Sequence, residues 1–190
     1  SHVLDEPTAV ADLLQLDNAG VVDIGGGTTG IAIVKQGKVT YSADEATGEI
    51  QTRILNTLGT VAGETADAFV TLNDAMLAGG AYIYVPKSVI VPKPIVIVHW
   101  CEGENVAVFD RTLVQVDQNA SVSIIERFET SNQKILLSSV TECIVGQNSH
   151  VKFLTTQEDG KNTTHVGVHR SHVYRDGSFE SSTVSLGGKY

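Results

Sequence analysis

The second half of the chain repeats one pattern of apolar and polar positions. Three short apolar-leaning runs each end in Asp, Asn or Gly and then resume: 114–120, 143–149 and 172–178. Their turn positions Asn119, Asn148 and Gly177 are 29 residues apart, and a further step of 29 back reaches Ile90 in another such run. A fixed period of roughly 20–50 residues is typical of stacked repeat architectures. Any all-β chain with evenly spaced turns offers an alternative, but the constant interval favours a strand-based repeat.

Runs rich in β-branched and aromatic residues predict the strands of this repeat. They occupy 82–85, 88–91, 95–100, 112–116, 121–126, 135–145, 151–157 and 164–174. Pro86, Pro92 and Pro94 separate the first of these runs. Because proline cannot donate a hydrogen bond to a sheet, these residues predict corners between short strands.

Ahead of these strands the apolar residues follow helical spacing. A helix is predicted over 9–16, after the acidic and proline residues that suit a helix start, and another over 50–58. A third predicted helix, over 66–77, places Phe69, Leu72 and Met76 at i, i+3 and i+7.

Between 21 and 41 the pattern predicts a different unit. Short apolar runs at 21–24, 31–34 and 39–41 flank a glycine-rich turn and a second turn at 35–38. This order predicts a strand, a glycine-rich turn and a further hairpin.

The glycine-rich turn has the composition of a phosphate-binding loop: Gly25, Gly26, Gly27, Thr28 and Thr29. Glycines without Cβ atoms let the backbone approach a phosphate and point successive N–H groups at it. The threonine hydroxyls add donors, and Asp23 at the strand end is suited to hold a magnesium ion or its water. A plain glycine-rich hairpin turn remains the alternative, because such turns are common.

The bulk composition limits the kinds of partner. With 42% hydrophobic and 18% charged residues, the chain is typical of globular proteins. Its net charge of −9 argues against nucleic acid or anionic membranes as partners. No apolar run approaches the roughly 20 residues that span a bilayer, and no secretory signal is visible. Two cysteines do not make a disulfide framework, so reduced thiols and a cytoplasmic location are expected.

The first part of the chain resembles a known family. VLDEPTA at 3–9, VDIGGGTTG at 22–30 and YSADEATG at 41–48 closely resemble EutJ, the chaperone-like ethanolamine-utilisation family. EutJ is similar to the DnaK- and actin-type ATPases, whose glycine loop grips the phosphates of ATP. The resemblance implies phosphate binding by Asp23, Gly25–Gly27 and Thr28, with Glu6 near the magnesium ion. The other phosphate loop and the adenosine pocket of these ATPases have no counterpart here, so ATP hydrolysis is not expected.

The later part resembles a second family. DAFVTLNDA at 67–75, GAYIYVPKSV at 80–89 and FESSTVSLG at 179–187 look like SufD and, more distantly, SufB. These are the scaffold proteins of the Suf iron–sulfur cluster assembly machinery. The resemblance runs from about 66 to 190. It implies a right-handed parallel β-helix, an association with iron–sulfur clusters, and partners of the SufB and SufC type.

Three histidines and two cysteines are the remaining candidates for chemistry. On a strand, His165 and His169 share a face but lie about 13 Å apart, and His172 faces the other way. They are therefore not expected to close on one metal ion. For Cys101 and Cys143, burial as small hydrophobic residues is the commoner role, and no cluster ligand is assigned.

The sequence thus predicts a mainly β protein, an incomplete right-handed parallel β-helix after an N-terminal α/β fragment. Its expected parts are a EutJ-like fragment (1–48), a connecting segment with short helices (49–80) and a SufD-like β-helix (81–190). A natural fusion, an engineered join or a sequence artefact would each give such a chain. The expected function is that of a non-catalytic scaffold, and the alternatives are a nucleotide-binding module and a remnant with structure but no activity. We also expect self-association at the uncovered last coil.

Overall fold

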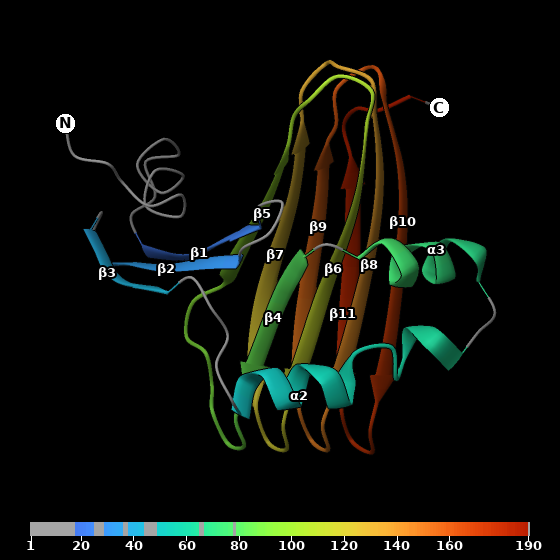
Figure 1. Ribbon diagram of the computed structural model, residues 1–190. Coiled ribbons are helices and arrows are strands. Elements are labelled where there is room, and N and C mark those ends of the chain that lie inside the picture. The colour runs from blue at the N-terminus through green and yellow to red at the C-terminus, as the bar shows by residue number, and fades with distance from the viewer. Residues whose placement is uncertain are drawn as a thin grey trace.

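The main body of the protein is a parallel β-solenoid of about four turns (Figure 1). The computed structural model describes residues 18–24, 29–35, 38–43, 49–64, 67–77 and 79–189, with side chains described from residue 52 onward. The helix predicted over 9–16 lies outside the described residues.

Each turn of the solenoid contributes one strand to each of two sheets. One sheet has the order β10-β8-β6-β4 and the other β11-β9-β7-β5, and all neighbouring strands are parallel. The strands are β4 (Gly79–Val85), β5 (Ile95–Cys101), β6 (Val106–Val116), β7 (Ser121–Thr130), β8 (Ile135–Val145), β9 (His150–Glu158), β10 (Thr163–Val173) and β11 (Ser178–Ser185). The predicted parallel β-helix is therefore confirmed.

The register of the strands shows the length of each turn. Val116 pairs with Val145 and Val145 with Val173, so successive turns advance by 29 and then 28 residues. The period of 29 is thus correct for one step and one residue too long for the next. The one-residue difference falls in a turn, because the paired strands of these coils keep their register throughout.

The turns that join the two sheets are marked by residues with positive φ. In the turns that lead from the β4–β6–β8–β10 sheet to the other sheet these are Ser88, Asn119, Asn148 and Asp176, one in each coil. The two asparagines occupy the positions that the sequence predicts. Asparagine tolerates this conformation better than most residues, and Asn148 Nδ2 donates to Asn119 Oδ1 at 2.8 Å across the stack.

The two outer turn positions predicted by the period are wrong. The equivalent residue in the last coil is Asp176, not Gly177, because that coil is one residue shorter. In the first coil it is Ser88, not Ile90, because Ser88 N donates to Gln118 O, beside Asn119. The predicted strand over 88–91 is also wrong, since this stretch is a turn followed by a single bridge at Ile90.

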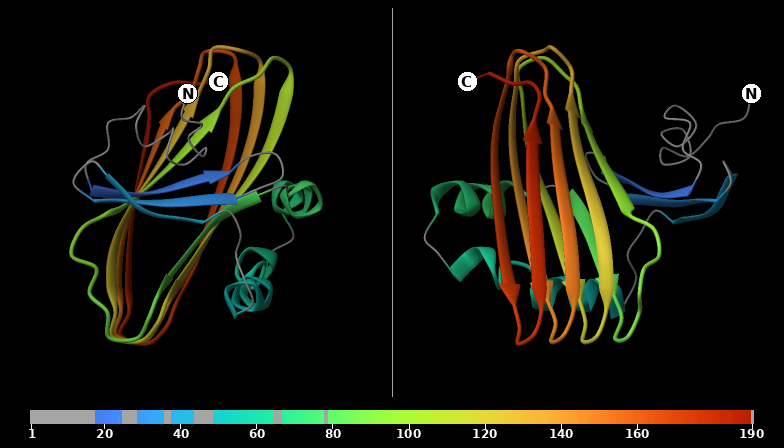
Figure 2. Two further views of the ribbon diagram at one scale, coloured as in Figure 1. Left: turned by 60° about the vertical axis from the view of Figure 1, so that its left-hand side comes forward. Right: turned by 180° about the vertical axis from the view of Figure 1, so that it is seen from behind.

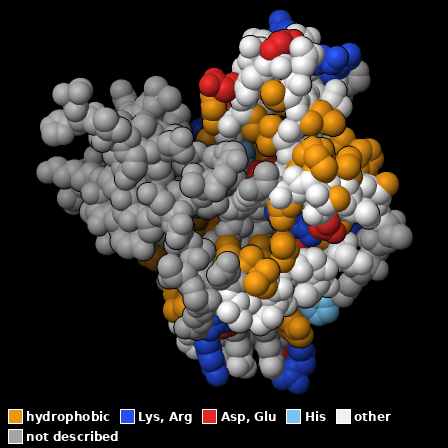
Figure 3. All heavy atoms as spheres, in the orientation of Figure 1, with side chains coloured by type: hydrophobic (Ala, Val, Ile, Leu, Met, Phe, Trp, Pro, Cys, Tyr) orange, Lys and Arg blue, Asp and Glu red, His pale blue; other side chains and the backbone are white. Residues whose placement is uncertain are grey.

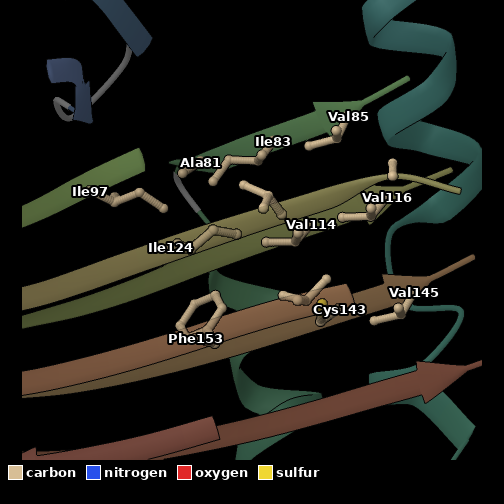
Figure 4. Packing of buried hydrophobic residues seen from close by; sticks show 13 residues of the cluster. Ala81, Ile83, Val85, Ile97, Val114, Val116, Ile124, Cys143, Val145 and Phe153 are labelled. Carbon is tan, nitrogen blue, oxygen red and sulfur yellow. The ribbon is translucent and has the colours of Figure 1, made fainter. Parts of the chain in front are cut away.

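The apolar core fills one half of the space between the two sheets. Inward-facing residues of successive coils stack there, including Ile83, Val114, Cys143 and Phe153 (Figure 4). Val114 and Cys143 are fully buried and occupy paired positions on neighbouring strands. Burial of such side chains contributes on the order of 1.5–3 kcal/mol each, so this stack is the main source of stability.

Helices cover the outer side of the β4–β6–β8–β10 sheet (Figure 2). They are α2 (Glu49–Thr57), the short 3-10 helix η1 (Ala62–Glu64) and α3 (Ala68–Met76), close to the predicted ranges. The side chain of Asp67 begins α3 by accepting hydrogen bonds from the backbone N–H groups of Phe69 and Val70.

The face that α3 buries is not its most apolar one. Val70 and Asn73 are buried against the sheet, whereas Phe69, Leu72 and Met76 are 47%, 41% and 54% exposed. Asn73 is buried because its amide Nδ2 donates to two strand carbonyl groups at 3.0 Å each. The apolar spacing of 69, 72 and 76 therefore marks the outer face of this helix.

A separate three-stranded sheet precedes the helices. It consists of β1 (Asn18–Ile24), β2 (Thr29–Lys35) and β3 (Lys38–Ala43), paired antiparallel in the order β1-β2-β3. The predicted strands around the glycine-rich turn are confirmed. The sheet lies at the first coil, with β1 against β5 (Figure 1).

Candidate functional site

The predicted phosphate-binding residues are only partly within the described structure. Asp23 is the second-last residue of β1 and pairs with Gly30, and Thr29 begins β2. Gly25, Gly26, Gly27, Thr28 and Glu6 lie outside the described residues. The strands thus bring Asp23 and Thr29 to the same end of a hairpin. Phosphate binding itself stays a prediction.

The other half of the solenoid interior holds buried polar side chains beside a smaller apolar cluster, and His99 is one of these polar residues. His99 Nδ1 contacts Asp110 Oδ2, and His99 Nε2 lies 3.2 Å from Glu126 Oε1. All three side chains are buried. Burial alone would lower the pKa of His99, but Asp110 and Glu126 together raise it to about 10. His99 is therefore a charged imidazolium between two carboxylates at neutral pH.

Two threonines complete the hydrogen bonding of Glu126. Thr112 Oγ1 donates to Glu126 Oε1 at 2.6 Å, and Thr141 Oγ1 donates to Glu126 Oε2 at 3.2 Å. The ring of Phe128 stacks on His99 with centroids 4.4 Å apart. Since the partners come from the first three coils, this network joins the coils through side chains as well as through the backbone.

A second histidine contact lies nearer the last coil. His165 Nδ1 is 2.9 Å from Asp159 Oδ2, and His165 Nε2 is 2.8 Å from Ser139 Oγ. Oδ1 of Asp159 and Oδ1 of Asp110 are buried without a hydrogen-bond partner. Such atoms mark interior positions where ordered water is expected.

The three histidines of β10 have different surroundings. His165 and His169 face the interior, where His169 packs edge-on against the rings of Phe153 and Phe179. Burial lowers the pKa of His169. His172 is exposed and lies against Tyr174. Across the described part of the chain, no three His, Cys, Asp or Glu side chains are grouped closely enough to hold a metal ion.

Both cysteines are free thiols in the interior, as predicted. Burial raises the pKa of Cys101 to about 12, and the neighbouring Asp110 and Asp159 add to the effect. Burial alone raises the pKa of Cys143 to about 12. Because the thiolate is the reactive form, neither thiol is a nucleophile at neutral pH in this fold.

A second polar cluster lies outside the solenoid, beneath the helices. The buried carboxylate of Glu142 accepts from the backbone N–H groups of Gly59, Val61 and Ala62 at 2.8–3.0 Å. Arg111 Nε and Nη2 donate to the same carboxylate at 3.0 and 2.7 Å. Burial would raise the pKa of Glu142, but these N–H groups and the guanidinium lower it overall.

The same arginine also ties α3 to the sheet. Arg111 Nη1 donates to Asp74 Oδ1 at 2.5 Å and to Asn73 Oδ1 at 3.2 Å. The helical segment is thus anchored through one carboxylate and one guanidinium. Sequence reasoning missed both polar clusters, although polar residues at inward-facing strand positions, such as Glu126, were a visible signal.

The chain matches a family model over residues 99–190, described as "SUF system FeS cluster assembly, SufBD core domain". It is 31% identical over 159 residues to an iron–sulfur cluster assembly SufBD family protein of Staphylococcus saprophyticus, covering 81% of this chain and 34% of the relative. A SufBD family protein of Staphylococcus aureus strain MRSA252 is 31% identical over 160 residues, with 82% and 34% covered. The β-solenoid is therefore similar in sequence to SufBD family proteins.

The start of the chain has different relatives. It is 98% identical over 48 residues to the ethanolamine utilization protein EutJ of Escherichia coli strain K12, covering 25% of this chain and 17% of that protein. The EutJ protein of Salmonella typhimurium matches equally well. This chain therefore joins a EutJ-like fragment to a SufB/SufD-type solenoid. It spans about a sixth of the EutJ proteins and about a third of the SufBD relatives.

Two further comparisons concern structure and membranes. No solved structure gives a significant match. None of the helices in the described residues is long and apolar enough to cross a membrane.

Proposed function

We propose that the solenoid is a non-catalytic scaffold segment for iron–sulfur cluster assembly, with the cluster as cargo and SufB- and SufC-type proteins as partners. The observation that carries this proposal is the SufBD core match over residues 99–190, which includes strands β6 to β11 of the solenoid. The interior supports a structural role, because Cys101 and Cys143 are buried thiols with raised pKa values.

The free edges of β10 and β11 supply a contact for such partners. In the described residues, both strands are at the end of their sheets and pair on one side only. Unpaired strand edges are templates for pairing with another chain. A SufB- or SufD-type solenoid would add its strands here, and a second copy of this chain offers the same edge.

The test is direct binding of the purified chain to SufB- and SufC-type proteins of Staphylococcus saprophyticus. We expect binding to at least one, measured by interferometry, and loss of binding in Thr183→Lys, which places a charge on the edge strand β11. Lys87→Glu, at an exposed position in the turn after β4 and away from β11, is the matched control. Failure of both proteins to bind the wild-type chain would refute the proposal.

Self-association is measured on the same two variants by light scattering. We expect the wild-type chain to form larger species as its concentration rises, and Thr183→Lys to remain monomeric. A single monomer peak for the wild-type chain over the whole concentration range would rule out self-association at this edge.

The EutJ-like fragment supports a second candidate function, nucleotide binding. The observation in its favour is the 98% identity to EutJ over 48 residues that include Asp23 and the glycine-rich turn. Thermal unfolding with ATP and magnesium tests it. Nucleotide should raise the melting temperature of the wild-type chain but not of Asp23→Asn, and the absence of any rise at millimolar ATP would end this candidate.

A further inference from the structure

The outer face of α3 carries an apolar ridge that no described residue covers. Phe69, Leu72 and Met76 form it, and each is more than 40% exposed. Figure 3 shows hydrophobic side chains gathered over α3 and the part of the sheet above it. Monomeric proteins seldom expose contiguous apolar patches of this kind unless the patch binds something.

Next to this ridge, the surface of the sheet is hollowed. The hollow has a volume of about 560 Å³ and lies at the starts of β6, β8 and β10. Its floor is apolar, with Ala107 and the 38% exposed Leu136. Lys134 and Lys189 are its charged lining residues, and no acidic residue lines it. In a chain of net charge −9, this is a locally basic site.

Ridge and hollow are adjacent on the same face of the molecule. Asn73 of α3 donates to Ser138 O of β8, which fixes the helix across that strand. Leu136 lies two residues before Ser138, about 7 Å along the strand at the usual rise. The helix that carries the ridge therefore crosses β8 next to Leu136 on the floor of the hollow.

We propose that this surface docks an amphipathic helix of a partner protein, with apolar side chains against the ridge and floor and acidic side chains toward the lysines. An amphipathic helix is long enough to contact both the ridge and the hollow. Its apolar side chains recur every three to four residues, which matches the spacing of the ridge residues. A small organic anion would fill the hollow but leave the ridge exposed. Charge complementarity favours an acidic partner, because the rim holds two cations and no carboxylate.

The probe is a synthetic amphipathic peptide with leucines on one face and glutamates on the other, labelled for fluorescence anisotropy. Its counterpart carries lysines in place of the glutamates. The full chain should bind the glutamate peptide at least about tenfold more tightly than the lysine peptide at low salt. Met76→Asp and Lys134→Glu should each weaken binding of the glutamate peptide about tenfold, or about 1.4 kcal/mol.

Lys152→Glu and Val184→Asp are the controls, because these exposed residues belong to the other sheet. Because Met76 and Lys134 are exposed, Met76→Asp and Lys134→Glu should leave the melting temperature of the chain unchanged. If Met76→Asp fails to fold, Leu72→Ser takes its place. Equal binding of the two peptides, or equal weakening by Lys152→Glu, would overturn the proposal. Decanoate that binds the hollow while the glutamate peptide does not would show that the occupant is a small anion instead.

Discussion

The buried imidazolium of His99 gives the sharpest prediction for stability. His99 lies between Asp110 and Glu126, and its pKa in the folded protein is about 10 against an ordinary 6.5. Replacing it by glutamine leaves two buried carboxylates without their counter-charge. Breaking a buried ion pair by removing one partner costs about 3–5 kcal/mol. The rise in the pKa of His99 from 6.5 to about 10 leads to a similar value. At 1.36 kcal/mol per pKa unit, it corresponds to a contribution of roughly 5 kcal/mol to the free energy of unfolding.

The pH dependence of this loss has a definite sign. Because folding raises the pKa of His99, its contribution is fully present below pH 6.5 and is lost as the pH rises through about 10. The gap in unfolding free energy between the wild-type chain and His99→Gln should therefore be largest at pH 6.5 and shrink steadily toward pH 10.

Urea unfolding at several pH values between 6.5 and 10, followed by circular dichroism, measures this gap. The control is His172→Gln, since His172 is exposed and its ring lies against Tyr174. That variant should unfold like the wild-type chain at every pH. A His99→Gln gap that stays constant across the range, or that is below about 1 kcal/mol at pH 6.5, would refute a charged His99.

Two other predictions concern buried polar groups. Glu142→Gln should lower the unfolding free energy by about 3 kcal/mol in urea titrations near pH 7, because an amide nitrogen would face N–H donors. The pKa of Glu142 is lowered by folding, so the difference in unfolding free energy from the wild type should disappear as the pH falls below 4.5. For comparison, Asp74→Asn changes a half-exposed carboxylate and should lower the unfolding free energy by less than about 1 kcal/mol. Cys101 and Cys143 should react with a thiol reagent at pH 8 only after urea is added, and rapid reaction in the native state would contradict their burial.

The repeat could be predicted from the sequence because turn chemistry and strand composition recur in each coil. Asn119 and Asn148 were found in this way, since asparagine suits the positive φ that the turn requires. Asp176 and Ser88 were missed because the first and last coils differ from 29 residues, and spacing alone cannot detect a residue gained or lost within a turn.

The polar clusters and the orientation of α3 could not be predicted by the same reasoning. His99 meets Asp110 and Glu126 only after the coils stack, and the three positions have no common spacing. For α3, the apolar spacing points to one face, but the hydrogen bonds of Asn73 bury another. A buried amide that satisfies strand carbonyl groups outweighs the apolar pattern, which no count of hydrophobic residues reveals.

The contacts of the helical segment bear on where the two parts of the chain meet. Besides the Glu142 anchor, Arg53 of α2 lies over the ring of Tyr84, 4.5 Å from its centroid. The match to the Staphylococcus saprophyticus relative covers 81% of the 190 residues. A continuous stretch of that length includes 49–80 wherever it begins, so the similarity to the SufBD relatives includes the helices. The described residues of this segment, 49–64 and 67–77, therefore pack against the solenoid, and they belong to the part of the chain that is similar to the SufBD relatives. The short helices that the sequence predicts in this segment thus form a layer on the outer side of the solenoid.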